Sequence, residues 1–320
     1  MNQNMQKVLQ AALCMTRQCW EQGMLSYALL ECGTEMKELL EMIVYDMVLR
    51  QSSDGRLCNV EDTPAVTDSA FCIPAVLAVG ERTGNEEYVR AAHRNAEYLR
   101  CDAERTKDGI LYHMRGTTQI WADSAAFLPY ALVITGHPEE GYVQMAGILD
   151  RLYRKESGLY AHIWEEETAS FPDGNAWSVG NGWILTGLER TWRALPGEMK
   201  AEKNALKEKY RNLLDRILAL QCTDGGYHDV MDDPTTYMES ETPAMIACAV
   251  YAGMRDGLFA DADSSMKEML REKADAMSAY VRGKILPDGR IAQAASSPFF
   301  DRPGTSVECQ AHALMMEKLC

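Results

Sequence analysis

The sequence predicts an all-α protein folded as an (α/α)6 toroid, in which an inner ring of six helices lies inside an outer ring of six. Three observations predict it. Segments with helical periodicity alternate between amphipathic and almost wholly apolar, the links between them alternate between short and long, and two of the apolar segments share a similar sequence. An open α-solenoid is the alternative, but it would not bury one helix of every pair on all sides.

Twelve segments have the 3.6-residue periodicity of helices. They span residues 3–18, 20–32, 35–50, 67–80, 85–100, 119–135, 138–152, 177–194, 201–221, 239–256, 262–283 and 305–319. The odd-numbered segments have one apolar stripe, as in residues 201–221, which is typical of a helix with one face in water. The even-numbered segments, such as residues 70–79 and 125–134, are apolar nearly all round, which indicates burial on all sides.

The links between the segments carry the second signal. Links from even to odd segments are short, whereas five links from odd to even segments are long and each contains an Asp-Gly or Ser-Gly turn. These turns are SDGRL (53–57), KDGIL (107–111), ESGLY (156–160), TDGGY (223–227) and PDGRI (287–291). Their recurrence indicates a repeated helical hairpin, and we expect residues 1–320 to form a single domain.

Composition excludes several classes of function. A net charge of −15 without any Lys/Arg cluster argues against binding to nucleic acid or to an anionic membrane. No apolar run approaches the ~20 residues of a membrane span, and residues 1–15 lack the basic start of a signal peptide. The ten cysteines include no CxxC pair, so free thiols are expected rather than disulfides or a zinc site. We expect a cytoplasmic protein, monomeric or homodimeric.

Acidic residues gather at the N-terminal turns of the apolar segments. They are Glu21, Asp68, Asp123, Glu239, Glu241 and Glu308. If these segments form an inner ring, their starts share one mouth of the barrel, which also receives the long links. Acids in a first turn are often only helix caps, and capping is the favoured interpretation for Glu21 and Glu308. Asp68 and Asp123 instead begin the two similar stretches, DSAFCIPAVL and DSAAFLPYAL, and we interpret them as functional.

Tryptophans and an asparagine accompany these acids. Trp121 lies two residues before Asp123, and the eighth segment begins with WSVGNGW, which spans Trp177 to Trp183. Indole faces stack on the C–H faces of sugars, and Asn181 offers both a donor and an acceptor. A lone tryptophan usually belongs to the core, but this shared position favours a sugar site.

Acids and tryptophans at one mouth indicate carbohydrate chemistry. Ordinary glycosidases use two carboxyl groups, one protonated as acid and one acting as base or nucleophile. Two neighbouring carboxyls cannot both ionise easily, so one pKa rises, whereas a helix N-terminus acts in the opposite direction. Asp123 is therefore a proton donor only if burial and Asp68 outweigh the helix dipole. His113 and His162 follow two of the turns at equivalent offsets and are further candidates for substrate contact.

Several motifs together resemble glycoside hydrolase family 105, the unsaturated rhamnogalacturonyl hydrolases, which are related to the family 88 unsaturated glucuronyl hydrolases. The motifs are WEQG (20–23), QIWADS (119–124), SVGNGW (178–183), DGGYHDVMDDPTTYMESE (224–241) and GTSVECQAHALMM (304–316). The resemblance runs from about Trp20 to Met316, and IWAD followed by GNGW is its most specific part.

The resemblance implies an unusual glycosidase that needs no metal and no organic cofactor. Members remove the 4,5-unsaturated uronic acid that a polysaccharide lyase leaves at a chain end, by hydrating its C4=C5 vinyl ether. The family's catalytic Asp matches Asp123, which protonates C4 and then takes a proton from the water that adds at C5. A second family Asp matches Asp68 and assists. The expected partner is a small oligosaccharide with an unsaturated uronate end.

The resemblance and the residue pattern together also nominate a substrate-binding set. Its members are Trp20, Glu21, His113, Trp121, His162, Trp177, Asn181 and Trp183. At one position the sequence departs from the family. Many members have an arginine, which contacts the substrate, where this chain has Val179. Other groups are then candidates to bind the uronate carboxylate: Ser178, Thr305, Ser306 and Arg115.

Other classes of function stay open at this point. An ordinary inverting glycosidase or a sugar epimerase could use the same toroid, with His113 and His162 as the pair that an epimerase favours. A non-catalytic helical protein that binds carbohydrate is the third alternative, because a fold alone does not determine function.

Overall fold

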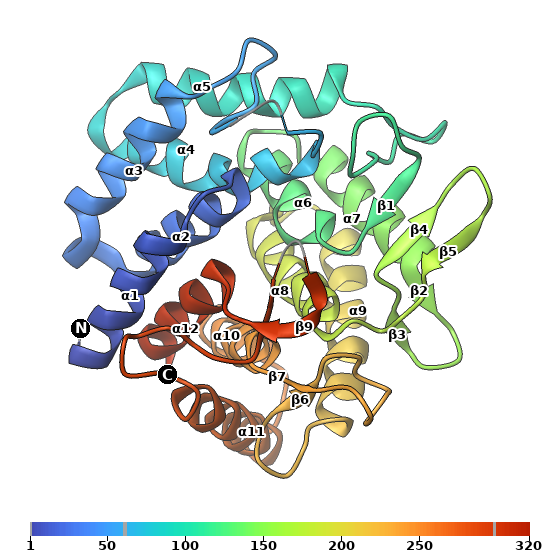
Figure 1. The fold of residues 1–320 in the computed structure, drawn as a ribbon. Helices are drawn as coiled ribbons and strands as arrows, with labels where there is room; N and C mark the ends of the chain where they lie inside the picture. Colours follow the sequence, from blue (N-terminus) through green and yellow to red (C-terminus); the bar gives the residue numbers. More distant parts are fainter. Residues whose placement is uncertain (1, 60–62, 297–298) are drawn as a thin grey trace.

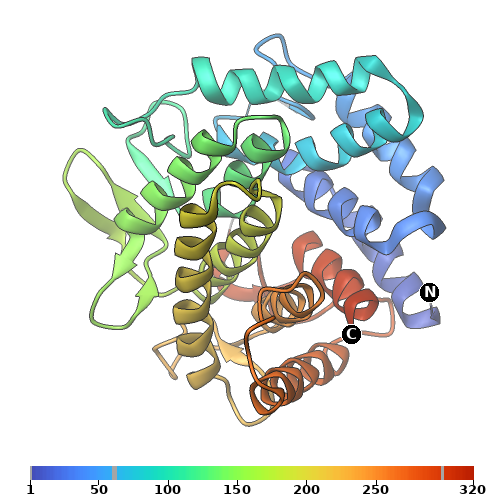
Figure 2. The same ribbon diagram turned by 180° about the vertical axis from the view of Figure 1, so that it is seen from behind.

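The computed structural model describes residues 2–59, 63–296 and 299–320 and confirms the predicted toroid (Figures 1 and 2). The inner ring consists of α2 (Cys19–Cys32), the 3-10 helix η2 (Thr67–Cys72) with α4 (Ile73–Thr83), α6 (Ser124–Ile134), α8 (Ser178–Ala194), α10 (Glu241–Arg255) and α12 (Val307–Leu319). The outer ring consists of α1 (Gln3–Met15), α3 (Lys37–Leu49), α5 (Glu86–Glu97), α7 (Pro138–Leu152), α9 (Lys200–Ala219) and α11 (Ser264–Arg282). The 3-10 turn η1 (Gly33–Met36) joins α2 to α3, and the π-helical turn η3 (Tyr98–Asp102) extends α5.

The inner ring is closed, which excludes the open solenoid. Each inner helix packs against the next one along the chain: α2 against η2, η2 against α6, and so on through α8 and α10 to α12. The last inner helix then packs against the first, because α12 contacts α2, and it also contacts α1. Both chain ends therefore lie on the same side of the molecule, as Figures 1 and 2 show.

Burial follows the two kinds of helix that the sequence predicts. α8 is buried from Ser178 to Thr191 and α10 from Glu241 to Gly253, whereas α9 buries only one stripe. An apolar helix surrounded by neighbours removes its whole surface from water, while an amphipathic helix removes one face. Within the described residues, no helix is long and apolar enough to cross a bilayer.

The five predicted turns share one backbone geometry. Their glycines, Gly55, Gly109, Gly158, Gly225 and Gly289, all have positive φ between 72° and 101°, which other residues rarely adopt. Four of the five turns also repeat the same pair of backbone hydrogen bonds; in the first, the Ser52 N–H donates to the Arg56 carbonyl and the Gly55 N–H donates to the Ser52 carbonyl. The repeat read from the sequence is thus a repeat of structure.

Short strands occupy the long links and gather at the mouth of the barrel. They are β1 (Gln119–Trp121), β2 (Tyr153–Arg154), β3 (Leu159–Tyr160), β4 (Ile163–Glu165), β5 (Ser170–Asp173), β6 (Tyr227–His228), β7 (Met238–Glu239), β8 (Ala294–Ser296) and β9 (Phe299–Gly304). The prediction of a helix from residue 119 is wrong at its start. Gln119 pairs with Glu165 in β4, so the chain is extended there and α6 begins only at Ser124.

The approach of α8 to α6 gives a stability prediction. A Cβ added to Gly187 would lie 2.0 Å from the carbonyl oxygen of Ala125, which is backbone and cannot rotate away. We expect Gly187→Ala to destabilise the protein by about 3 kcal/mol or more, despite the better helix propensity of alanine. The shift of the urea denaturation midpoint measures it. Gly197→Ala is the matched control, because a Cβ there meets nothing within 4 Å. Equal midpoints for the two variants would contradict the prediction.

Candidate active site

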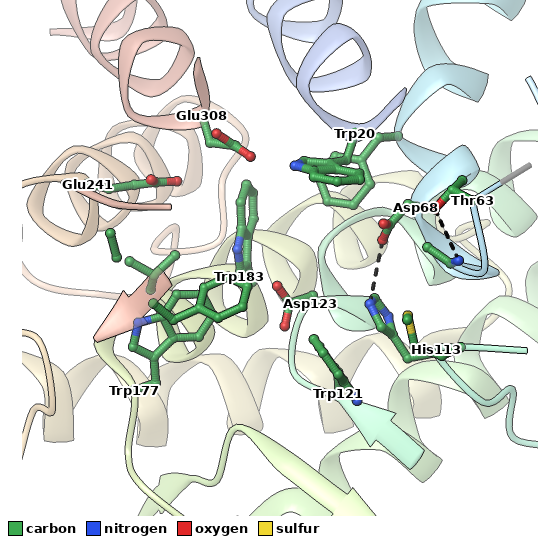
Figure 3. Close-up of a pocket in the computed structure, with 16 residues that line it drawn as sticks. Trp20, Thr63, Asp68, His113, Trp121, Asp123, Trp177, Trp183, Glu241 and Glu308 are labelled. Atoms are coloured by element: carbon green, nitrogen blue, oxygen red, sulfur yellow. Dashed lines mark hydrogen bonds and ion pairs between the residues drawn. The ribbon is translucent and has the colours of Figure 1, made fainter. Parts of the chain in front are cut away.

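The starts of the inner helices surround one cavity of about 250 Å³ at the mouth of the barrel (Figure 3). Each of the six helical units contributes: the lining includes Trp20, Asp68, Asp123, Val179, Glu241 and Glu308. The predicted convergence of the N-terminal turns is therefore observed. Four carboxyl groups, one histidine and four tryptophans line this cavity together, which is a combination suited to a sugar ring.

Asp68 and Asp123 do not act as helix caps. Asp123 occupies the N-cap position of α6, but its side chain makes no capping hydrogen bond. Asp68 lies within η2, for which Val66 is the N-cap residue, and no side chain forms a capping hydrogen bond there. Glu21 differs, because its carboxylate accepts from the N–H of Gln18 at 2.7 Å within a capping box. The two aspartates thus keep their carboxyl groups for the cavity.

Asp68 faces His113 across one side of the cavity (Figure 3). His113 Nε2 lies 3.7 Å from Asp68 Oδ1, and its Nδ1 lies 2.7 Å from the hydroxyl of Thr67. The imidazole stacks on Trp121 with ring centroids 4.5 Å apart. Burial lowers the pKa of His113 to about 4, so it is neutral at neutral pH. A neutral imidazole leaves the Asp68 carboxyl without a cation.

Asp123 faces a second histidine, His162, whose pKa is raised whereas that of His113 is lowered. His162 Nε2 lies 3.4 Å from Asp123 Oδ2, while its Nδ1 lies 2.9 Å from Asp173 Oδ2. Burial acts to lower the pKa of His162, but the carboxylates on its two sides outweigh burial and raise it to about 9. β5 carries Asp173 and pairs with β4, which directly follows His162, so the hairpin positions the pair. His162 is a cation at neutral pH.

These surroundings give the two aspartates opposite proton affinities. Burial first, and then the neighbouring carboxyls of Asp123 and Glu308, raise the pKa of Asp68 to about 8. Burial also acts to raise the pKa of Asp123, but the facing His162 outweighs it, and the pKa lies below its ordinary value. At neutral pH the free protein therefore holds a protonated Asp68 beside an ionised Asp123. Such a divergence marks an acid and base pair.

The tryptophans predicted to bind sugar line the cavity. Trp20, Trp121, Trp177 and Trp183 all contribute to its wall. Trp183 packs edge-on against Phe71, and Trp177 packs edge-on against Phe300 of β9. Figure 3 shows Trp20 and Trp183 between the carboxyls of Glu241 and Glu308 on one side and those of Asp68 and Asp123 on the other.

Three predicted binding residues lie outside this lining. The Asn181 amide accepts from the Tyr160 N–H and donates to the carbonyls of Tyr160 and Trp177, so it ties β3 to the start of α8. Glu21 caps α2, as the capping interpretation had it. His162 lines a neighbouring cavity with Asp173 and reaches this site through Asp123.

Val179 lines the cavity at the position where an arginine was expected. The hydroxyls proposed to replace that arginine are engaged elsewhere. Ser178 Oγ accepts from Thr242, Ser306 Oγ donates to Glu241 Oε2, and Thr305 Oγ1 contacts the sulfur of Met15. Arg115, which donates to the Thr63 carbonyl, is outside the cavity lining.

Sequence reasoning did not nominate four residues that lie near the aspartates: Glu241, Glu308, Asp173 and Phe300. Glu241 and Glu308 carry the same signal as Asp68, an acid in the first turn of an apolar helix. The interpretation of Glu308 as a helix cap is wrong, because the Ser306 side chain caps α12 and Glu308 lines the cavity. Asp173 and Phe300 come from β5 and β9, which have no periodicity to read. Only the folding of these links over the mouth brings them to the site.

The chain matches a family model and resembles two named proteins. The model of Glycosyl Hydrolase Family 88 matches residues 1–299. The chain is 26% identical over 249 residues to the unsaturated rhamnogalacturonyl hydrolase YesR of Bacillus subtilis, a match that covers 72% of this chain and 69% of that protein. It is also 26% identical over 155 residues to the unsaturated 3S-rhamnoglycuronyl hydrolase of Formosa agariphila, covering 43% of this chain and 41% of that protein.

Solved structures share the fold. A crystal structure from Salmonella enterica, described as a possible member of the GH105 family, superposes with a TM-score of 0.84 at 18% identity, covering 99% of this chain and 92% of that chain. The unsaturated glucuronyl hydrolase from Bacillus sp. GL1 superposes with a TM-score of 0.70 at 16% identity, covering 94% of this chain and 84% of that chain. The predicted family relationship is confirmed. Because the family model spans most of its length, the chain belongs to Glycosyl Hydrolase Family 88, and it is a glycoside hydrolase.

Proposed function

We propose that the protein removes a terminal 4,5-unsaturated uronic acid from oligosaccharides that a polysaccharide lyase has generated. The observation that carries this proposal is the pair of carboxyls with opposite proton affinities in one cavity, Asp68 above and Asp123 below the ordinary pKa. Hydration of a vinyl ether needs an acid that protonates carbon and a base that takes a proton from water. The names of the two relatives are consistent with such substrates.

The opposite pKa shifts of Asp68 and Asp123 support a separate role for each in the two proton transfers. In our proposal the Asp68 carboxyl gives its proton to C4, and water adds at C5 while Asp123 takes a proton from that water. The hemiketal at C5 opens by breaking its bond to the ring oxygen, which leaves a hemiacetal at C1. That hemiacetal then breaks its bond to the leaving sugar, which departs as an alcohol. One water is consumed, and the proton that Asp123 gains replaces the one that Asp68 lost. The family pattern assigned both transfers to Asp123, whereas its ionised state beside His162 favours the role of base.

Of the two competing enzyme functions, the site disfavours the epimerase. An epimerase would need two histidines that both exchange protons, but His113 is neutral and stacked on Trp121, while His162 is held between two carboxylates. An ordinary inverting glycosidase also needs an acid and a base, so only an experiment separates it from the proposed hydratase-like reaction.

A panel of substrates tests the proposal. Lyase digests of pectin, glycosaminoglycans and algal polymers, and saturated nitrophenyl glycosides as the comparison, are given to the purified protein. We expect loss of the ultraviolet absorbance of the C4=C5 bond with at least one digest and no nitrophenol release. Release from saturated glycosides with unchanged ultraviolet absorbance would instead identify an ordinary glycosidase, and no turnover of any substrate would favour a binding protein.

We further propose pectin fragments as the natural substrates and the cytoplasm as the location. The relative that matches over the longer stretch is named for rhamnogalacturonyl substrates. All ten cysteines are free in the structure, and unpaired thiols suit a reducing compartment. We propose a single catalytic domain over residues 1–320, acting as a monomer or homodimer.

A further inference from the structure

The cavity lacks a cation for the anion that its proposed substrate carries. Among the described residues that line it, none is Lys or Arg, and residues 60–62 and 297–298 contain neither by sequence. The lining instead contains four carboxyl groups, those of Asp68, Asp123, Glu241 and Glu308. A uronate carboxylate that entered this cavity would be repelled by every one of these acids that is ionised, because charge interactions are strong in a buried site. Its partner must therefore be a neutral donor.

Glu241 and Glu308 form a pair on the far side of the cavity from Asp68 and His113 (Figure 3). They begin α10 and α12, which pack against each other. Glu241 is 1% exposed, and its Oε2 accepts from the Ser306 hydroxyl at 2.7 Å. Its Oε1 has no hydrogen-bond partner among the described residues, although a buried oxygen normally has one. This unpartnered oxygen belongs to a side chain that lines the cavity.

Both acids are in surroundings that favour the protonated form. Burial first, and then Glu308 and Glu239, raise the pKa of Glu241 well above its ordinary value. Burial first, and then Glu21, raise the pKa of Glu308 to about 7. The Asp123 carboxylate also acts to raise the pKa of Glu308.

The other neighbours do not supply a positive charge. His312 Nδ1 lies 3.8 Å from Glu241 Oε1, but burial lowers the pKa of His312 to about 3, so it is neutral. Trp20 of α2 donates a hydrogen bond to Glu308 through its indole N–H, which carries no positive charge. Nothing that faces the pair stabilises its ionised form enough to reverse the effect of burial.

We propose that Glu241 and Glu308, as neutral carboxylic acids, bind the carboxylate of the unsaturated uronate in place of the arginine that Val179 replaces. The inference rests on the proposed function. Each acid has an O–H that donates to an anionic oxygen, and such charge-assisted bonds are short and strong. The bound anion in turn stabilises the protonated acids, so binding and protonation support each other.

Substrate binding should weaken as the pH rises. The binding form of Glu308 is the protonated one, which is present below about pH 7 and lost as the pH rises through that value. Above the pKa of Glu308, its protonated fraction falls about tenfold with each further pH unit, and binding weakens by the same factor. Ionisation of Glu308 should raise KM, because it weakens substrate binding. Ionisation of Asp68 should lower kcat, because it removes the proposed proton donor.

The test compares an unsaturated uronyl oligosaccharide with its carboxyl methyl ester between about pH 5 and 9. We expect the KM of the free acid to rise about tenfold per unit above about pH 7 and the KM of the ester to stay flat. In Glu308→Gln the rise with the free acid should disappear, because an amide donates without ionising. Asp229→Asn is the matched control and should keep the rise, because burial raises the pKa of Asp229 to about 7 as well, but in the neighbouring cavity.

Several results would overturn the inference. These are a flat KM for the free acid, an equal rise for acid and ester, or an unchanged rise in Glu308→Gln. If that variant does not fold, the comparison of acid and ester with the unmodified protein decides. If no unsaturated uronide is turned over, the proposed function fails separately. Calorimetry with the inactive Asp123→Asn variant then decides, since binding of the free acid must weaken as the pH rises, and absence of binding contradicts the inference.

Discussion

Asp123→Asn is expected to lower kcat by about 10³-fold or more on an unsaturated uronyl oligosaccharide, since general base catalysis contributes ~10²–10⁴-fold. An amide cannot take a proton from the attacking water. The substitution also removes the negative charge that helps to raise the pKa of Asp68 to about 8. The pKa of Asp68 should therefore fall, and the residual kcat should begin to decrease at a lower pH than in the unmodified protein. The decrease in ultraviolet absorbance of the C4=C5 bond measures both effects.

The control for this variant is the state of the fold. His162 keeps Asp173 as a partner when Asp123 is neutral, so the imidazolium is not left alone. We expect a circular dichroism spectrum like that of the unmodified protein and retained substrate binding. A folded Asp123→Asn protein with more than about a tenth of the original kcat would exclude Asp123 from proton transfer.

Asp68→Asn is expected to cause a loss of similar size, because an amide cannot protonate carbon. The variant should also change the shape of the pH profile. A protonated Asp68 is present below its pKa of about 8 and disappears above it, so kcat of the unmodified protein falls as the pH rises through that value. Asp68→Asn should have no such fall. Profiles of kcat against pH for both proteins measure the difference.

Asp68→Glu separates chemistry from structure at this position. Glutamate restores a titrating carboxyl, so part of the activity and the alkaline fall should return together. If Asp68→Asn keeps the alkaline fall near pH 8, another group is the acid and the division of roles between the two aspartates is wrong. A proton donated by Asp123 would also reverse the pattern, with the alkaline fall lost in Asp123→Asn instead.

Much of the fold could be predicted because its signals are local. Periodicity separates buried from half-buried helices, and the Asp-Gly and Ser-Gly turns occur where backbone with positive φ is required. The strands could not be predicted in this way. Gln119 is extended because it pairs with Glu165, and Ile120 because it pairs with Trp164, partners more than 40 residues away. The sequence around residue 119 does not contain that information.

The residues of the candidate site could also be predicted only in part. Asp68 and Asp123 stand out as acids at the starts of apolar helices with related sequences, and the structure places both in one cavity. Asn181 and Glu21 carry the same kind of signal, but their hydrogen bonds are used within the fold. Sequence cannot distinguish a polar group that faces a cavity from one that holds two segments together.

The sequence by itself determined the alternation of helices, the toroid, the acidic mouth and the family. Only the tertiary structure decided which carboxyl holds a proton. A pKa depends on burial and on charges nearby in space, and the charges that matter come from distant segments: His162 beside Asp123, and Asp123 beside Asp68. The same reason explains why Glu241 and Glu308, 67 positions apart in the chain, become one proposed binding pair once α10 packs against α12.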